Sequence, residues 1–347
     1  MRLKSKSIMF SIVFMFFIIV IPWILQGYPL LFLLQLAINI AFAQSWNLGF
    51  SYAGLLSLGH ALFAGISGYV TVVICNMGIP IYISILIGAF TSMLFAVVVS
   101  PLLMRLRAIY FAIGTLILCN AFQYWFMHWT EAGRALGLRL RMYPEYSLSN
   151  CYYLAWIVAF IATVLPWIIV KSKLGLAALS VRDDVDRSEA IGVPTLLVKT
   201  IIFAISAFIA GLVGGVRVAY LLIIEPTLAF SFEQSLWATL AVVLGGTGTL
   251  IGPILGAAVI TSLQYALMNI PELSMLITGV MLILIILFLP RGLISIVKKI
   301  LQPLRKPNTH ARPPQRDQGT IKVLSNHKFP FSDCSESAVK DVCSFEH

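Results

Sequence analysis

The long stretch without charge near the start of the chain constrains its fold more than any other feature. From Ser7 to Met104 there is no Asp, Glu, Lys or Arg. Soluble domains carry about 25% charged residues, whereas this chain of 347 residues is 11% charged and 59% hydrophobic. Because a membrane span needs roughly 20 mainly apolar residues, the sequence predicts an all-α, polytopic membrane protein.

Apolar stretches separated by prolines and short polar turns predict about ten membrane segments. We expect them near residues 8–26, 29–48, 54–75, 80–104, 108–129, 151–170, 196–217, 234–250, 251–269 and 272–289. Pro29, Pro80, Pro194 and Pro290 mark breaks between them, since proline ends or kinks a helix. Glycine-rich polar stretches interrupt some segments, and these are expected to be broken or re-entrant.

The basic residues predict how these segments are oriented, because cytoplasmic loops carry an excess of Lys and Arg. If Arg2, Lys4 and Lys6 are cytoplasmic, six segments return the loop at 171–199 to the same side, and ten segments return the basic stretch after the last segment. We therefore expect both termini in the cytoplasm. The arginines between 134 and 141 then lie outside, as one exception to the bias.

We divide the chain into a transmembrane domain, residues 1–300, and a tail, residues 301–347. The tail is Pro-rich and polar near its start, with too little apolar surface to offset the entropy of ordering. We predict that it is disordered and cytoplasmic.

The charged loop, residues 171–199, contains four acids and several bases in an otherwise apolar chain. It ends at Gly192 and Pro194, residue types that stop a helix. Two interpretations stay open from the residues alone. The loop is either a docking element for a partner or a solvated connector between two membrane segments.

Within the charged loop, the pattern predicts a single short amphipathic helix over Ala177–Ile191. Arg182 with Asp186, and Asp183 with Arg187, are spaced four residues apart. Residues at this spacing share a face of a helix, so we expect two ion pairs there.

A second polar stretch lies between Asn47 and Val70, inside the predicted membrane domain. Its small residues allow close approach of helices, and its polar side chains need partners or a path. We interpret one group as lining a translocation path or packing helices: Asn47, Gly54, Ser57, Gly59, His60 and Gly65. For His60, a hydrogen bond between packed helices is preferred, since no second histidine or acid is close in sequence.

A glycine-rich stretch and a stretch bracketed by charged residues could also carry function, but we prefer structural interpretations for both. Leu244–Ala257 looks like a phosphate loop but lacks its Lys-Ser/Thr pair, so a helix break between two segments is expected. Arg217, Glu225 and Glu233 bracket a predicted outer loop. We interpret Glu225 as an ordinary solvated loop carboxylate, with contact to a partner or substrate as the alternative.

The sequence offers no support for catalysis, metal binding or nucleic-acid binding. It has no His-Glu-x-x-His or Gly-x-Ser-x-Gly motif, and its five cysteines lack metal-ligand spacing. The net charge of +10 is gathered at segment ends and in the tail, as the positive-inside rule predicts. A membrane enzyme without a known motif is the least favoured alternative.

Several ordered segments resemble the permease subunits of branched-chain amino-acid ABC importers, specifically the LivM-like branch. They lie within residues 35–295 and are Asn47–Val70, Arg105–Thr115, Gly175–Val193, Phe203–Gly215, Val243–Gly256 and Pro290–Gly292. By this resemblance the charged loop is the coupling element that fits a groove on the ATPase. The expected contact residues are Gly175, Arg182, Asp183, Asp184, Glu189, Ala190 and Gly192.

The resemblance implies a transport subunit of the bacterial inner membrane rather than an enzyme. It implies partner ATPase subunits, a second permease subunit and an extracytoplasmic solute-binding protein. No cofactor is expected on this chain, since ATP and Mg would be bound by the ATPase. The expected solutes are branched-chain or similar small neutral amino acids. A related permease for urea or short amides, and a stand-alone carrier or channel, are the alternatives.

Three departures from the family pattern bear on these expectations. Asn120 stands where relatives often carry Glu, and we include it among the candidate path residues. The outer loop Thr130–Arg139 lacks the usual Thr-Gly-Gly and Asp-Gly-Leu sequences. These two leave the substrate open. Arg187 and Ser188 stand where small alanines are usual, which suggests an adjusted ATPase contact.

Overall fold

The computed structural model describes residues 26–267, except for 107, 142, 144 and 145, and the isolated positions 21, 22, 24, 276, 277, 279, 280, 293 and 294. The predicted first and tenth segments lie almost wholly outside these residues. The predicted tail lies entirely outside them, so its disorder stays a prediction.

The described part is built almost entirely from helices. The α-helices are α2 (Tyr28–Asn47), α3 (Ala61–Asn76), α4 (Ile81–Leu103), α5 (Ala108–His128), α6 (Leu148–Lys171), α7 (Lys173–Asp183), α8 (Val185–Ala190), α9 (Thr195–Leu221), α10 (Pro226–Ala229), α11 (Phe232–Gly245) and α12 (Ile251–Ala266). A π-helical turn, η1 (Leu48–Tyr52), extends α2, and η2 (Arg134–Leu136) is a 3-10 turn. The short strands β1 (Leu138–Arg139) and β2 (Ile223–Ile224) pair antiparallel.

Six helical stretches in the described part are long and apolar enough to cross a membrane. They are Tyr28–Tyr52, Ile81–Leu103, Ile109–His128, Leu148–Lys171, Thr195–Leu221 and Pro226–Gly245. Helices α3 and α12 are apolar but have only 16 residues each, or about 24 Å at 1.5 Å per residue. The all-α membrane fold is confirmed, whereas the count of ten segments is not.

Two predicted segments are shorter than expected because their polar ends are not helical. The predicted segment 54–75 becomes helical only at Ala61, after an irregular stretch over residues 54–60. The predicted segment 234–250 stops at Gly245, and Gly246 and Gly248 follow with positive φ. Glycine adopts this conformation readily, so the helix ends there and the expected break before α12 is present.

Helix α9 lies at the centre of the described helices and packs against α2, α3, α4 and α6. Glycines make this close packing possible. A Cβ atom on Gly211 would lie 2.8 Å from the Cα of Ala89, and one on Gly214 would lie 2.0 Å from the carbonyl oxygen of Ala64. Gly211 and Gly214 therefore let the backbone of α9 approach α4 and α3 closely.

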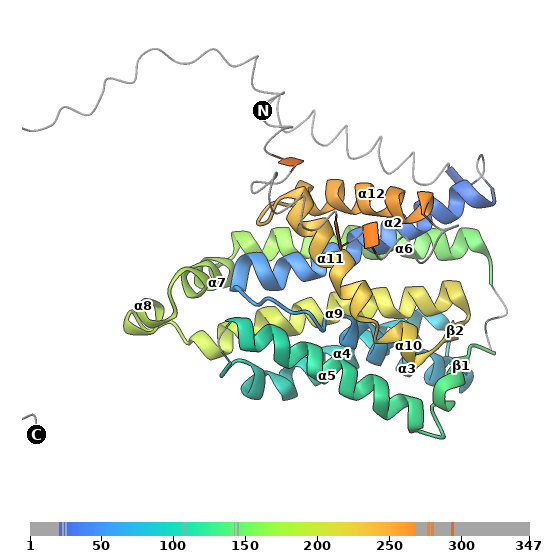
Figure 1. Cartoon of the computed structure of the whole chain (residues 1–347), viewed down its shortest axis with the longest axis horizontal. Coiled ribbons are helices and arrows are strands. Elements are labelled where there is room, and N and C mark those ends of the chain that lie inside the picture. Colours follow the sequence, from blue (N-terminus) through green and yellow to red (C-terminus); the bar gives the residue numbers. More distant parts are fainter. Residues whose placement is uncertain are drawn as a thin grey trace, which may run out of the picture. The chain divides into compact units, whose positions relative to one another are not determined.

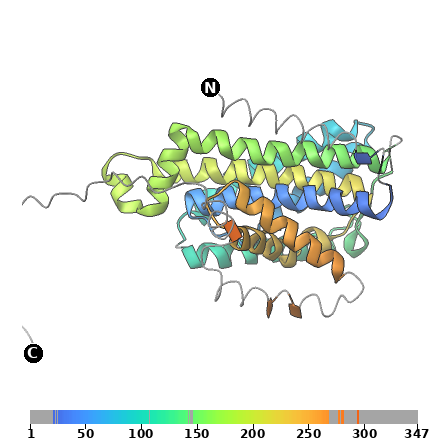
Figure 2. The ribbon, with the colours of Figure 1, turned by 90° about the horizontal axis from the view of Figure 1, so that it is seen from above.

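The helices place the charged loop and the β1–β2 pair at opposite ends. In Figure 1, α7 and α8 lie at one end of the bundle, and β1, β2 and α10 lie at the other. Figure 2 shows α7 and α8 beyond the ends of α6 and α9 in the perpendicular view. The loop therefore projects beyond the membrane helices, and its surface is separate from theirs.

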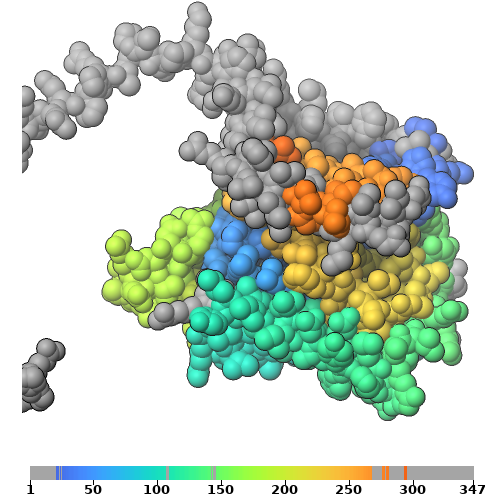
Figure 3. Space-filling model, in the orientation of Figure 1, coloured from blue at the N-terminus to red at the C-terminus, as the bar shows by residue number. Residues whose placement is uncertain are grey.

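Helix α5 lies in the teal to green region along the lower edge of the molecule in Figure 3, below the blue and yellow regions of α2 and α11. Its outer side carries large apolar side chains, with Ile109 72% exposed and Ile117 62% exposed. In water such a surface would be unfavourable. In this chain it is typical of a helix that faces lipid or another membrane subunit.

Candidate functional site

The charged loop contains two helices, not the single helix predicted over Ala177–Ile191. Asp184 has an extended backbone (φ −160°, ψ 114°) and separates α7 from α8. Its side chain accepts a hydrogen bond of 3.1 Å from the backbone N–H of Arg187, which caps the start of α8. An aspartate in this position favours a new helix start over continuation.

The break also changes the ion pairs. The predicted pairs with a spacing of four residues do not form, because the residues on either side of Asp184 no longer share one helix face. Instead, Arg182 contacts Asp183 at 2.7 Å, and Arg187 contacts Asp184 at 2.9 Å. Both pairs are local, and Arg187 is 89% exposed.

Two glycines set the path of the loop for different reasons. A Cβ atom on Gly175 would lie 2.4 Å from the carbonyl oxygen of Ile169 and 2.6 Å from the Cα of Val170. Gly175 thus lets α7 fold closely against the end of α6. Gly192 has φ +85° with no atom near its Cβ direction, so its backbone conformation, rather than lack of space, favours glycine.

Arg182 joins the charged loop to the end of the α2 segment. Its Nη1 donates a hydrogen bond of 2.7 Å to the backbone oxygen of Ser51, in η1. Gly54 lies against the same arginine, because a Cβ there would be 3.3 Å from the Cγ of Arg182. Gly54, expected among the path residues, therefore belongs to the contact between loop and membrane helices.

The far end of the loop is tied to the start of α9. Thr195 donates a hydrogen bond of 2.5 Å to Glu189. Glu189 and Gly192 line an open groove of about 680 Å³ that extends to Ser100 and Pro101 at the end of α4. Ala190 is exposed and Ile191 is 76% exposed. The outer surface of the loop therefore carries both charged and apolar groups.

Arg187 and Ser188 differ in their surroundings. Ser188 is 2% exposed, and its Oγ lies 2.6 Å from the Oγ of Ser180. It also donates a hydrogen bond of 2.7 Å to the backbone oxygen of Asp184. Ser188 thus holds α7 against α8 instead of facing a partner, and only Arg187 presents its side chain at the surface.

Asn47 connects the end of α2 to the turn before α12. Its Nδ2 donates to the backbone oxygen of Thr249 at 3.1 Å, and its Oδ1 accepts from the Ser51 hydroxyl at 2.6 Å. Gln44 adds a 2.7 Å hydrogen bond to the backbone oxygen of Leu250. The turn between α11 and α12 is therefore fixed to the same segment that Arg182 contacts.

His60 lies in the interior at the start of α3. Its Nε2 is 2.8 Å from the Oγ of Ser45, and the rings of Phe42 and Phe63 lie at 5.3 Å and 5.9 Å. With 1% exposure, His60 is a hydrogen-bonded group between packed helices. This placement agrees with the preferred interpretation from the sequence.

The start of α3 is buried, and the N–H groups at and just before it donate hydrogen bonds to side chains of two other helices. The hydroxyl of Thr115, on α5, accepts from the N–H groups of Leu58 and Gly59 at 3.2 Å and 3.4 Å. The hydroxyl of Ser235, on α11, accepts from the N–H of Ala61 at 3.0 Å. These side chains satisfy N–H groups that a helix start leaves unpaired, and our sequence reasoning did not identify them.

The candidate path residues do not form one cluster. Gly59 and Gly65 are packing positions, since a Cβ would lie 1.9 Å from the Thr115 oxygen and 2.4 Å from Phe230, respectively. Ser57 is 3% exposed, and its backbone oxygen accepts from Trp46. Asn120 is partly exposed on α5, where no hydrogen bond joins its side chain to another described residue.

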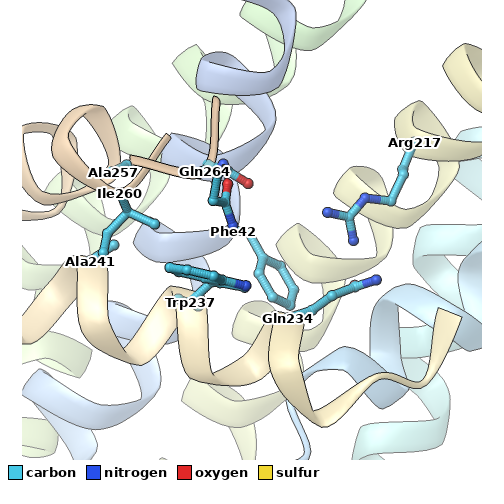
Figure 4. Close-up of a pocket in the computed structure, with 10 residues that line it drawn as sticks. Phe42, Arg217, Gln234, Trp237, Ala241, Ala257, Ile260 and Gln264 are labelled. Carbon is cyan, nitrogen blue, oxygen red and sulfur yellow. Dashed lines mark hydrogen bonds between the residues drawn. The ribbon is translucent and has the colours of Figure 1, made fainter. Parts of the chain in front are cut away.

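Arg217 was expected as the last residue of the segment 196–217. It lies on α9, one turn before the helix ends at Leu221. It lines a cavity of about 370 Å³ together with Gln35, Glu225 and Gln234. Figure 4 shows its side chain reaching from α9 toward the space between Phe42, Gln234 and Gln264, which line a second, small pocket.

The chain is similar to known permeases. A family model described as "Branched-chain amino acid transport system / permease component" matches residues 28–286. The high-affinity branched-chain amino acid transport system permease protein LivM of Salmonella typhimurium is 27% identical over 158 residues, 44% of this chain and 37% of that protein. LivH of Escherichia coli K12, from the same kind of system, is 26% identical over 153 residues, 43% of this chain and 49% of LivH.

A relative with a different name is equally similar. The autoinducer 2 import system permease protein LsrC of Photorhabdus laumondii is 27% identical over 160 residues, 44% of this chain and 48% of that protein. The chain thus spans less than half the length of each of these curated relatives. No solved structure matches it. Because the family model covers well over half of its residues, the chain belongs to the family of branched-chain amino acid transport system permease components, as its motifs predict.

Proposed function

We propose that this chain is the membrane-spanning permease subunit of an ABC importer for branched-chain or similar small neutral amino acids. It works with two ATPase subunits that bind ATP and Mg, a second permease subunit and an extracytoplasmic solute-binding protein. The complex lies in the bacterial inner membrane, with both termini of this chain in the cytoplasm. Family membership supports the permease role, and the names of LivM and LivH support the substrate class.

One contact carries the coupling part of the proposal: the hydrogen bond from Arg182 to the backbone of Ser51. It joins an exposed, charged loop directly to a membrane segment. A movement of α7 and α8 on the ATPase would therefore act on η1. From there, Asn47 would transmit it to the turn between α11 and α12.

A second candidate substrate class is favoured by one observation. LsrC, named for autoinducer 2 import, is as similar to this chain as LivM. A solute without amino and carboxylate groups is therefore the competing proposal. Uptake of labelled L-leucine and of autoinducer 2 by the same reconstituted complex separates the two.

The coupling assignment is tested by charge reversal on the loop. Arg187→Glu changes an exposed side chain whose ion pair is local, so the loop keeps its fold. We expect weaker co-purification of the ATPase subunits and lower ATP-driven uptake. Arg182→Glu also breaks the bond to Ser51 and is expected to lower uptake further.

The matched control is Arg139→Glu, an exposed arginine on β1 at the opposite end. This variant should bind the ATPase normally. If Arg182→Glu, Arg187→Glu and Glu189→Lys all retain ATPase association and uptake, the charged loop is not the coupling element. If uptake persists after ATP depletion, the chain is a stand-alone carrier or channel instead.

A further inference from the structure

Arg217 is unusual for its place in the membrane domain. It is the only charged residue between Lys199 and Glu225, and it lies on α9, which is 27 residues long and apolar enough to cross a membrane. A charged side chain in such a helix is energetically unfavourable. Where one occurs, it usually faces the protein interior or a cavity and takes part in function.

The guanidinium of Arg217 has no partner in the described part of the chain. Neither an ion pair nor a hydrogen bond joins it to another described residue, whereas Arg182 and Arg187 are both paired. Arginine offers five N–H donors and cannot lose its charge. Donors that the protein itself leaves open in a low-dielectric interior favour an anionic group from outside.

The direction of the side chain argues against simple contact with water at the helix end. Long cationic side chains near a helix end often extend along the helix to reach water. Figure 4 shows Arg217 extending from α9 toward Phe42, Gln234 and Gln264 instead. Arg217 and Gln234 line both the small pocket and the larger cavity, so the guanidinium lies where the two spaces adjoin.

The larger cavity has the size and lining of a small-molecule site. Its volume of about 370 Å³ falls within the range of ~300–1,000 Å³ usual for ligand pockets. Arg217 and Glu225 place opposite charges on its wall and lie beyond ion-pair distance of one another. Gln35 and Gln234 add amide groups. Much of the remaining wall is aliphatic and consists of Val218, Leu221, Ile223, Ile224 and Leu228.

This arrangement complements an aliphatic amino acid group by group. A guanidinium binds a carboxylate through two parallel hydrogen bonds. A carboxylate such as that of Glu225 attracts an ammonium group, and an aliphatic wall accepts an aliphatic side chain. A neutral solute such as a sugar or polyol would leave the charge of the arginine without a counter-charge.

We propose that Arg217 and Glu225 form the binding site for the carboxylate and ammonium groups of an aliphatic amino acid, in the cavity between α2, α9, α10 and α11. This inference rests on the proposed function and assigns its substrate contact to named residues. The solute is held near the end of the bundle opposite the charged loop, and Gln234 contacts it from α11.

The test uses the full complex of this chain with its ATPase, second permease and binding protein, reconstituted in vesicles and supplied with ATP. Labelled L-leucine is the probe. Arg217→Gln should lower leucine uptake at least ~10-fold, the effect expected for loss of hydrogen bonds to a charged group. Arg217→Lys keeps the charge without the planar fork and should give an intermediate rate.

Arg139→Gln is the matched control, since it removes an exposed arginine at the same end of the bundle. It should transport like the unchanged protein. Co-purification of all subunits and ATP hydrolysis report whether each variant assembles. If Arg217→Gln does not assemble, Glu225→Gln carries the test, with at least ~10-fold lower leucine uptake expected for the same reason.

Two other results have distinct meanings. Leucine uptake at the unchanged rate by assembled Arg217→Gln, or by assembled Glu225→Gln if it replaces that variant, overturns the site and leaves the proposed function standing. If the unchanged complex hydrolyses ATP and imports autoinducer 2 but not leucine, the proposed substrate class is wrong. The inferred amino-acid site is then also wrong.

Discussion

The two ends of the helix bundle treat charge in opposite ways. At the α7–α8 end, Arg182 and Arg187 each contact a neighbouring aspartate and are exposed. At the other end, Arg217 lines a cavity and has no partner among the described residues. Paired charges on an exposed loop shape a surface that another protein can bind. An unpaired charge inside the membrane domain keeps its donors available for a small ligand.

The largest expected difference between the ends comes from charge reversal. Arg217→Glu places a second carboxylate on the cavity wall that already carries Glu225. We expect loss of leucine uptake and a decrease in the yield of folded complex, because two carboxylates on one cavity wall repel each other. Size-exclusion chromatography in detergent and vesicle uptake measure both effects.

Arg187→Glu is the matching change at the loop end. Its exposed ion pair contributes at most ~1 kcal/mol, so the yield of folded complex should be unchanged even though ATPase binding weakens. Equal losses of folded complex in Arg187→Glu and Arg217→Glu would contradict the distinction between the two ends.

A smaller effect, on ATPase binding, is expected from substitutions of the two glycines that shape the loop. Gly175→Val places atoms against the backbone of Ile169 and Val170, so α7 must move away from the end of α6. We expect ATPase co-purification to fall at least several-fold. Gly192→Ala meets no atom and adds only backbone strain of ~1 kcal/mol, so it should retain more binding. A larger loss of ATPase co-purification in Gly192→Ala than in Gly175→Val would show that α7 is not held by close packing.

The cap between the two loop helices has a smaller, local effect. Asp184→Ala removes the hydrogen bond to the N–H of Arg187 and should destabilise α8 by about 1 kcal/mol. Hydrogen exchange of the 185–190 amides should become faster by roughly a factor of five. Asp186→Ala, in the first turn of α8 but not at the cap, should change exchange much less. Similar rates in the two variants would exclude the capping role.

The smallest effect on ATPase binding and uptake is expected at Ser188. Replacing it with alanine removes hydrogen bonds to Ser180 and Asp184, each worth about 1 kcal/mol. The methyl group still fits the buried position, so ATPase binding and uptake should stay near normal. A large loss of ATPase binding with unchanged loop stability would show that Ser188 contacts the partner after all.

The sequence was sufficient for the membrane fold and for the place of the charged loop. Long apolar stretches without charge predict membrane helices, because a helix satisfies its backbone hydrogen bonds internally in lipid. The same reasoning failed inside the loop. The spacing of Arg182 and Asp186 favours one helix, but the side chain of Asp184 competes by capping a new one.

The interior contacts could not be predicted from the sequence, for a different reason. Thr115 and Ser235 cap the start of α3 from positions 56 and 174 residues away from their N–H partners. No local pattern in the sequence records such pairs. Arg217 was misplaced because a charge next to an apolar segment was taken as the segment's end. In the structure α9 continues to Leu221 beyond it.

The late start of α3 has an electrical consequence. The N-terminus of a helix carries a partial positive charge of about half an elementary charge. At Ala61 this end is buried, and its first N–H groups donate to the Ser235 hydroxyl and to the backbone oxygens of Gly59 and His60 rather than to an acid. Positive ends of half-helices in membrane proteins raise the energy of cations nearby. The buried start of α3 therefore disfavours a cation at that depth, whereas an overall neutral solute is little affected.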